Sequence, residues 1–261
     1  MTSAKALYHR LIPERIRNPF GFARRSFADS LRRAITRPPL PPRELLANIQ
    51  LTPFLSEYLA IGKRSAKSIV GALALAGIAR DARVRVLDFG CGSARTLRHL
   101  RDTEWEIHGC DVDREAIDWV SKAIPFARFQ VNPSDPPLPY ERETFDAVFA
   151  VSLFTHFTEA QQTIWATELA RILKPRGVAL VSTLGPSVIE AFPRIATPEN
   201  RRILTEDGFV FVRGGEAFNS HGAFHTVNGI VRFFGSWFDL VAWMERGLDD
   251  FQDLTVLRKN A

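Results

Sequence analysis

The sequence predicts an α/β fold in which helices cover both faces of a doubly wound, mostly parallel sheet. Apolar, strand-like segments alternate with helical segments through residues 84–184. Connections of this length between parallel strands are right-handed crossovers, which place helices on both faces of the sheet. A turn with two glycines, 88–92, follows the first strand. Such sheets bind ligands outside the carboxyl ends of their strands, so we expect the functional site there.

The individual elements follow from the spacing of apolar residues. Helices are expected at 44–60 and 63–77, the second with Ile69, Val70 and Leu73 on one side and Gly77 near its end. Strands are expected at 84–89, 105–110, 126–131, 145–151 and 177–184, and the helices between them begin at Ser93 or span 113–123 and 159–173. The continuous apolar middle of FDAVFAV, 145–151, is typical of a strand buried on both faces.

Composition narrows the class of protein. A chain of 261 residues that is 46% hydrophobic can bury one large core and carry appendages. Its two cysteines, Cys91 and Cys110, match neither a disulfide framework nor a metal-ligand pattern, so we expect a reducing compartment and no metal site. Residues 1–20 carry charges where a signal peptide needs an apolar run, and no segment is long and apolar enough to span a membrane. We therefore expect a cytoplasmic protein.

The N-terminal arm, residues 1–43, is strongly basic. It contains ten Lys and Arg but only Glu14 and Asp29, a local net charge of +8 in a chain of net charge +5. Phe27, Leu31 and Ile35 fall at helical spacing, which indicates a short basic amphipathic helix before a proline-rich spacer. The arm fits a solvated tail, contact with an anionic membrane surface or an acidic protein, or, less well, nucleic acid or a targeting peptide.

The glycine turn and the end of the next strand together predict a nucleoside site. Gly90 and Gly92 permit unusual backbone torsions and close approach of a ligand, and the helix expected from Ser93 would offer its first N–H groups. Nineteen residues after Gly92, Asp111 ends the second strand, where a carboxylate can accept both hydroxyls of a ribose. Arg95 stands where a dinucleotide site requires its third glycine. Together with the anionic Asp88, this favours a positively charged ligand without a diphosphate, such as S-adenosylmethionine (SAM).

At these residues the sequence resembles the class I SAM-dependent methyltransferases. Their first motif, Asp/Glu-x-Gly-x-Gly-x-Gly, is present as DFGCGSA, 88–94, with alanine in place of the last glycine. GCDVDREAID is similar to the second motif, and ELARILKPRGVALVST is similar to the helix, turn and fifth strand of the family. The resemblance covers most of residues 45–260 and implies a Rossmann-like, seven-stranded, mostly parallel sheet with N-terminal helices.

The resemblance also implies which residues bind SAM. Asp88 would contact the amino-acid end, Asp111 the ribose hydroxyls, Val112 the adenine ring, and Asn132 or Asp135 the adenine amine. The segment AVSLFTHF is similar to the one that separates cofactor from acceptor in the family. The predicted cofactor-binding residues are Asp88, Phe89, Gly90, Gly92, Asp111, Val112, Asn132, Asp135 and Ser152.

The C-terminal part fits the same pattern. A helix at 226–237 and a hairpin of strands at 238–244 and 253–259 would complete the fold, leaving 185–225 as an insertion after the fifth strand with one short strand at 209–213. We expect two parts, the arm 1–43 and a methyltransferase domain 44–261, with the insertion covering the acceptor pocket. The pattern resembles bacterial methyltransferases of the type 11/12 group.

Three histidines are candidates for the general base that a hydroxyl acceptor requires. His156 follows the fourth strand, and His221 and His225 belong to the insertion. Positioning two bound reactants supplies about 7–11 kcal/mol and a base only about 3–5, so catalysis does not depend on finding a base.

We therefore expect a SAM-dependent methyltransferase that acts on an oxygen of a small molecule or saccharide. RNA methylation is an alternative that the basic arm supports weakly, but the segment SLFT lacks the Asn/Asp-Pro-Pro-aromatic pattern of base-amine methylases. A non-catalytic SAM-fold subunit that binds a partner through the arm is a third possibility.

Overall fold

The computed structural model describes residues 28–29, 35–47, 55–213 and 221–260. The chain divides into two compact units, 1–60 and 61–261. The first unit has the short helix α4 (Arg43–Ala47) and a small core formed by Leu40, Leu46, Leu55 and Tyr58. The Asp29 carboxylate accepts a hydrogen bond of 2.9 Å from the Leu55 N–H, at the first residue of the next helix. The basic helix predicted around 27–35 lies largely outside the described residues.

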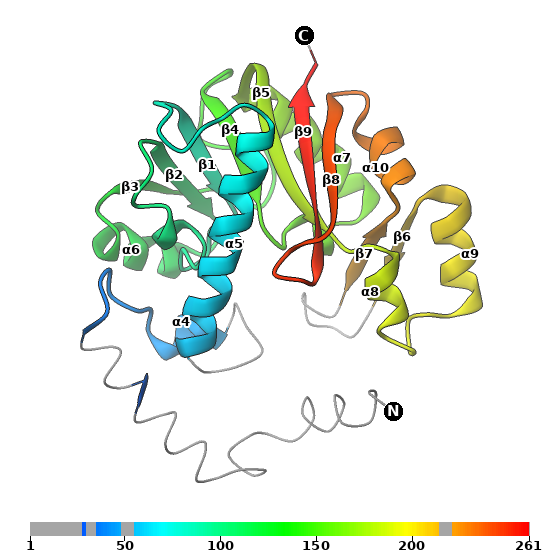
Figure 1. The fold of residues 1–261 in the computed structure, drawn as a ribbon, viewed down its shortest axis with the longest axis horizontal. Coiled ribbons are helices and arrows are strands. Elements are labelled where there is room, and N and C mark those ends of the chain that lie inside the picture. The colour runs from blue at the N-terminus through cyan, green and yellow to red at the C-terminus, as the bar shows by residue number, and fades with distance from the viewer. Residues whose placement is uncertain (1–27, 30–34, 48–54, 214–220, 261) are drawn as a thin grey trace. The chain divides into compact units, whose positions relative to one another are not determined.

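A seven-stranded sheet organises the second unit, in the order β3-β2-β1-β4-β5-β9-β8 (Figure 1). The first five strands in that order run parallel, whereas β9 is antiparallel to β5 and β8 is antiparallel to β9. Their bounds are β1 Arg85–Phe89, β2 Glu106–Asp111, β3 Ala127–Val131, β4 Phe145–Ala150, β5 Leu173–Thr183, β8 Phe238–Leu248 and β9 Gln252–Lys259. The predicted doubly wound fold is confirmed.

Helices cover both faces of the sheet. Residues of α5 (Leu55–Leu75) and α6 (Arg114–Ala123) pack on one face, and those of α7 (Glu159–Ile172) and α10 (Val227–Phe234) pack on the other. Three of these helices begin where a side-chain oxygen accepts a backbone N–H: Asp113 caps α6, Thr158 caps α7 and Thr226 caps α10. These caps are local sequence signals, which explains why the predicted helix starts agree closely with the structure.

The break predicted between the helices 44–60 and 63–77 is wrong, because α5 runs without interruption from Leu55 to Leu75. Gly62 does not break this helix. A Cβ atom at Gly62 would lie only 2.0 Å from the backbone oxygen of Arg95. The glycine therefore allows the helix to approach the chain beyond β1, which is a tertiary requirement that helix periodicity does not reveal.

The helix predicted from Ser93 is also wrong. Gly92 and Ala94 have φ values of 49° and 57°, and an α-helix requires successive residues in the right-handed region. Turns therefore follow β1, and they lead to one turn of 3-10 helix, η1 (Leu97–His99). The chain beyond the glycine turn thus offers individual N–H groups of a turn rather than the start of an α-helix.

The insertion 185–225 contains more structure than the single strand predicted for it. It forms two helices, α8 (Pro186–Glu190) and α9 (Pro198–Asp207), and a two-stranded antiparallel sheet of β6 (Phe209–Val212) and β7 (Gly222–His225). Val188, Leu204 and Phe224 belong to its own apolar cluster. The start of α9 has a readable signal, Thr197 followed by a proline, because the Thr197 hydroxyl accepts the Asn200 N–H.

His225 connects this insertion to α7 through a buried hydrogen bond. Its side chain is completely buried, and its Nε2 lies 3.0 Å from Oε1 of Gln162, which is also completely buried. The ring is surrounded by aromatic rings, with centroid distances of 4.8 Å to Phe209, 6.2 Å to Phe233 and 6.5 Å to Phe234. Because burial disfavours the charged imidazolium, the pKa of His225 falls to about 3.

Among the described helices, none is long and apolar enough to cross a membrane.

We predict that acid destabilises the wild-type protein more than a His225→Gln variant. The unfolded chain takes up a proton at this histidine near its ordinary pKa of 6.5, whereas the native state binds it only near 3. Stability contributed by neutral His225 is therefore present above pH 6.5 and declines by about 1.4 kcal/mol per pH unit as the pH falls toward 3. Urea unfolding at about pH 7 and about pH 5 should show the wild type losing about 2 kcal/mol more than the variant. Equal losses would contradict this role of His225.

Candidate functional site

The glycine turn lies at the carboxyl edge of the sheet, where β1 ends beside β2 and β4. Gly90 has φ 78°, and the N–H groups of Gly90 and Cys91 both donate to the Cys110 carbonyl, at 2.9 and 3.0 Å. A Cβ at Gly90 would lie 3.0 Å from the Leu153 side chain. The turn is therefore fixed to the end of β2 and has glycine where both the left-handed conformation and the contact with Leu153 favour it.

Asp111, the last residue of β2, is bonded to this turn. Its Oδ2 accepts the Gly92 N–H at 2.7 Å, and its Oδ1 accepts the Asp113 N–H at 2.9 Å. Burial raises the pKa of Asp111, while these backbone hydrogen bonds oppose the rise. Each carboxylate oxygen can accept a second hydrogen bond. The structure thus brings the predicted ribose-binding acid and the predicted glycine turn together.

Asp88 is a buried carboxylate at the same edge, with only 3% of its surface exposed. Burial raises its pKa well above the ordinary value, repulsion from Asp111 raises it further, and Arg95 lowers it. Two buried carboxylates near each other favour the binding of a cation. A positive ligand would stabilise the charged form of Asp88 against burial and would reduce its repulsion from Asp111.

The predicted adenine-binding residues differ in their positions. Asn132 is buried, its N–H donates to the Asp111 carbonyl at 3.0 Å, and its Nδ2 donates to the Pro133 carbonyl at 2.8 Å. Its Oδ1 is buried without a hydrogen-bond partner. Val112 is 59% exposed at the end of β2, and Asp135 is exposed and accepts a hydrogen bond from Ser134. Of the two residues predicted for the adenine amine, Asn132 has the buried, unsatisfied acceptor.

Phe89 and Ser152 complete the predicted cofactor residues. The Phe89 ring packs 4.7 Å from the Trp165 ring in the core beside α7, so its side chain is a packing element and only its backbone belongs to the turn. Ser152 follows β4 with φ 58°, and its N–H donates to Oγ of Ser182 at 2.7 Å. Its hydroxyl accepts a hydrogen bond of 2.8 Å from Nε2 of Gln252.

Ser182 and Gln252 were missed by the sequence reasoning. They come from β5 and from the start of β9, far along the chain from the glycine turn. One signal exists: the final strand of this fold is antiparallel, so its first residues must lie at the carboxyl edge of the parallel strands.

The structure brings two of the predicted histidines together. His156, in the 3-10 helix η2 (Phe154–His156) after β4, has its Nδ1 3.1 Å from the backbone oxygen of His221. A carbonyl only accepts hydrogen bonds, so Nδ1 carries the proton and Nε2 carries the lone pair when the ring is neutral. Burial lowers the pKa of His156 below 6.5. His225 lies at the end of β7, enclosed by aromatic rings and bonded to Gln162.

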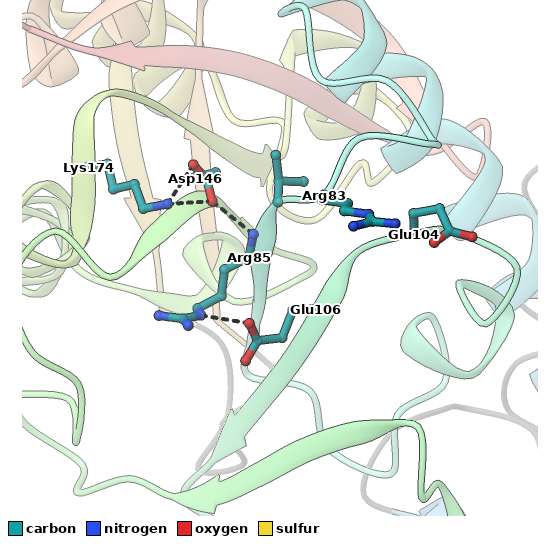
Figure 2. Close-up of a pocket in the computed structure, with 7 residues that line it drawn as sticks. Arg83, Arg85, Glu104, Glu106, Asp146 and Lys174 are labelled. Carbon is teal, nitrogen blue, oxygen red and sulfur yellow. Dashed lines mark hydrogen bonds and ion pairs between the residues drawn. The ribbon is translucent and has the colours of Figure 1, made fainter.

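At the amino edge of the sheet, opposite the glycine turn, the side chains are charged and form ion pairs. A hollow of about 430 Å³ lies beside the starts of β1, β2 and β4, and ion pairs of Arg85 with Glu106 and of Lys174 with Asp146 line it (Figure 2). Asp146 also accepts the Arg85 N–H at 2.8 Å. These charges are paired with one another, which indicates a structural role at the edge opposite the glycine turn.

Cys91 and Cys110 are free and buried. Within the described ranges, no group of three or more His, Cys, Asp or Glu side chains could hold a metal ion.

Comparison with known proteins gives one family match and several similar folds. Residues 86–177 match a family model described as a methyltransferase domain. The chain is 30% identical over 112 residues to the biotin biosynthesis bifunctional protein BioHC of Cellvibrio japonicus, a match that covers 43% of this chain. It spans only 22% of the length of that relative.

Solved structures show the fold. A SAM-dependent methyltransferase from Methanosarcina mazei is 18% identical with a TM-score of 0.52, covering 70% of this chain and 94% of that chain. An S-adenosylmethionine-dependent methyltransferase from Clostridium acetobutylicum is 11% identical with a TM-score of 0.55, covering 76% of this chain and 92% of that chain.

We predict that Asp88→Asn stabilises the unliganded protein. The amide has nearly the shape of the carboxyl group but no charge, so it avoids both the cost of burial and the repulsion from Asp111 that raise the pKa of Asp88. Urea unfolding at neutral pH should give a gain of about 1–2 kcal/mol, the usual scale for relieving a destabilised functional site. Asp118→Asn, at an exposed position of α6, is the control and should change stability by less than about 0.5 kcal/mol. A loss of stability in Asp88→Asn would show that the charge stabilises the fold.

Proposed function

We propose that this protein transfers a methyl group from SAM to an oxygen of a small molecule or saccharide, because residues 86–177 match a methyltransferase-domain model and the chain has the fold of solved SAM-dependent methyltransferases. The observation that carries the proposal is the contact between Asp111 and the glycine turn. It places a carboxylate that is oriented by backbone N–H donors at the end of β2, beside the turn.

The residues at the carboxyl edge fit SAM in charge and in hydrogen-bonding capacity. Asp111 would accept the ribose hydroxyls, and Oδ1 of Asn132, a buried acceptor without a partner, suits the adenine amine, which is a donor. Asp88 would lie toward the positive amino-acid end, where a cation favours its charged form. When bound, SAM supplies a methyl group on a positively charged sulfur. The N–H groups of Gly90 and Cys91 are bonded to the Cys110 carbonyl, which holds the turn in place, so the protein's contribution is mainly orientation.

An oxygen acceptor is supported by the state of His156. A hydroxyl loses its proton when it attacks carbon, and the base that accepts the proton must be neutral. Burial keeps the pKa of His156 below 6.5, so the ring is neutral at pH 7, and the His221 carbonyl holds the tautomer whose lone pair is on Nε2. We propose His156 as the base and His221 as the residue that orients it through its backbone. His225 would serve by holding the insertion in place.

The proposals on acceptor class, partners and location rest on the composition of the chain and on its similarity to BioHC. BioHC is named for biotin biosynthesis, which agrees with a small-molecule acceptor. The net charge of +8 in residues 1–43 favours peripheral contact with an anionic membrane or an acidic protein, and we do not propose nucleic acid because the rest of the chain is slightly acidic. We propose a cytoplasmic location.

The first test is calorimetric titration with S-adenosylhomocysteine, the demethylated product of SAM. Asp111→Ala should weaken binding about 10- to 100-fold, because charge-assisted hydrogen bonds to two hydroxyls are lost. Asp118→Ala, exposed on α6, is the matched control and should bind like the wild type. Equal affinity in Asp111→Ala would reject the ribose assignment.

The second test follows labelled methyl transfer into glycan and metabolite pools. His156→Ala should reduce turnover about 10²- to 10⁴-fold while S-adenosylhomocysteine still binds. In the wild type the rate should fall as the pH drops through the pKa of His156, because the protonated ring cannot accept a proton; that pKa lies below 6.5. Unchanged turnover and an unchanged pH profile in the variant would remove His156 as the base.

A further inference from the structure

We propose that Gln252, at the start of β9, binds the ammonium group at the amino-acid end of SAM, because its buried side-chain oxygen lies beside Ser152 at the carboxyl edge of the sheet without a hydrogen-bond partner. The proposal rests on the proposed function and adds a cofactor-binding residue from the C-terminal hairpin.

The sheet order places Gln252 on the route of the cofactor's tail. Asp111 at the end of β2 would hold the ribose, and the strand order reverses between β1 and β4, where a crevice forms. Neighbouring strands lie about 4.8 Å apart, so β4 is about 10 Å from β2. The chain of atoms from the ribose through the sulfur to the amino acid can cover a span of this size. Ser152 stands just beyond β4, and Gln252 contacts it.

The side chain of Gln252 is only half satisfied. Its Nε2 donates to Oγ of Ser152 at 2.8 Å, whereas its Oε1 is buried and has no partner among the described residues. An acceptor that is buried without a donor destabilises the protein unless a ligand or water supplies one. Gln252 therefore presents an unused acceptor at the edge where SAM would bind.

The protein holds Ser152 and the backbone next to Gln252 in place. Ser152 is in the left-handed region, with its N–H bonded to the buried Ser182 hydroxyl. Next to Gln252, Oδ1 of Asp253 accepts the Arg246 N–H at 2.8 Å across the β8–β9 turn. The same turn carries Asp249, which forms an ion pair with Arg64 of α5. The turn lies at the lower edge of the sheet in Figure 1. These contacts order the surroundings of Gln252, and its amide is held by the hydrogen bond to Ser152.

The chemistry of the cofactor leaves one donor for this acceptor. SAM has three groups that donate hydrogen bonds: the adenine amine, the ribose hydroxyls and the ammonium. The first two are matched by Asn132 and Asp111, which lie on the other side of β1 from β4. The ammonium is the donor that remains. Asp88 is on β1, which lies between β2 and β4, and its carboxylate favours a positive group near this edge.

The experiment compares three ligands by titration calorimetry of the full chain. S-adenosylhomocysteine has the ammonium and the carboxylate, its decarboxylated form keeps only the ammonium, and 5′-methylthioadenosine has neither. Gln252→Leu should weaken the first two about tenfold, the effect of losing one hydrogen bond to a charged group, and should leave methylthioadenosine within about twofold. Gln252→Glu adds a negative charge beside the ammonium and should keep or tighten the binding of the first two.

Each alternative outcome is distinct. Equal weakening of the binding of all three ligands by Gln252→Leu would indicate a structural role. Weakening confined to S-adenosylhomocysteine would indicate that Gln252 contacts the carboxylate of the ligand. Either result, or unchanged binding of all three ligands, overturns the proposal. If Gln252→Leu melts well below the wild type, weaker binding of the first two ligands by Gln252→Glu overturns it instead. Gln130→Leu, at an exposed position of β3, is the matched control and should bind all three normally. Failure of the wild type to bind any of them would overturn the proposed function itself.

Discussion

The contact on which the site depends is the pair of hydrogen bonds that Asp111 accepts from the Gly92 and Asp113 N–H groups. It joins the end of β2 to the turn beyond β1, and the Cys110 carbonyl fixes the same turn one residue earlier. A carboxylate held in this way cannot rotate away from the crevice, so a sugar would meet an acceptor that is already oriented. These backbone donors offset part of the cost of burying it.

The two edges of the sheet have opposite electrostatic character. At the amino edge, Arg85 is paired with Glu106 and Lys174 with Asp146. At the carboxyl edge, burial and the nearby Asp111 raise the pKa of Asp88, and Asn132 retains a buried acceptor without a partner. A buried carboxylate with a raised pKa and an unpartnered acceptor at one edge favour a ligand site there, whereas the ion pairs at the opposite edge indicate a structural role.

Local sequence signals account for most of the elements that were predicted correctly. Continuous apolar runs identify the parallel strands, and Asp113, Thr158 and Thr226 mark helix starts through caps that involve only neighbouring residues. The errors arise where distant contacts decide the conformation. Gly62 lies between the two helices predicted at 44–60 and 63–77, but it is inside α5 and allows the backbone of Arg95 to approach. Ala94 lies in the helix predicted from Ser93 but has a positive φ.

The sequence by itself determined the fold class, the glycine turn and the acid at the end of β2, because these depend on residue types at short, fixed spacings. Tertiary structure decided the rest of the site. It showed that Phe89 packs in the core, that His156 and His221 meet while His225 is enclosed, and that Gln252 reaches Ser152. Those relations join residues up to 100 positions apart, and only the pairing of strands and the burial of side chains bring such residues into contact.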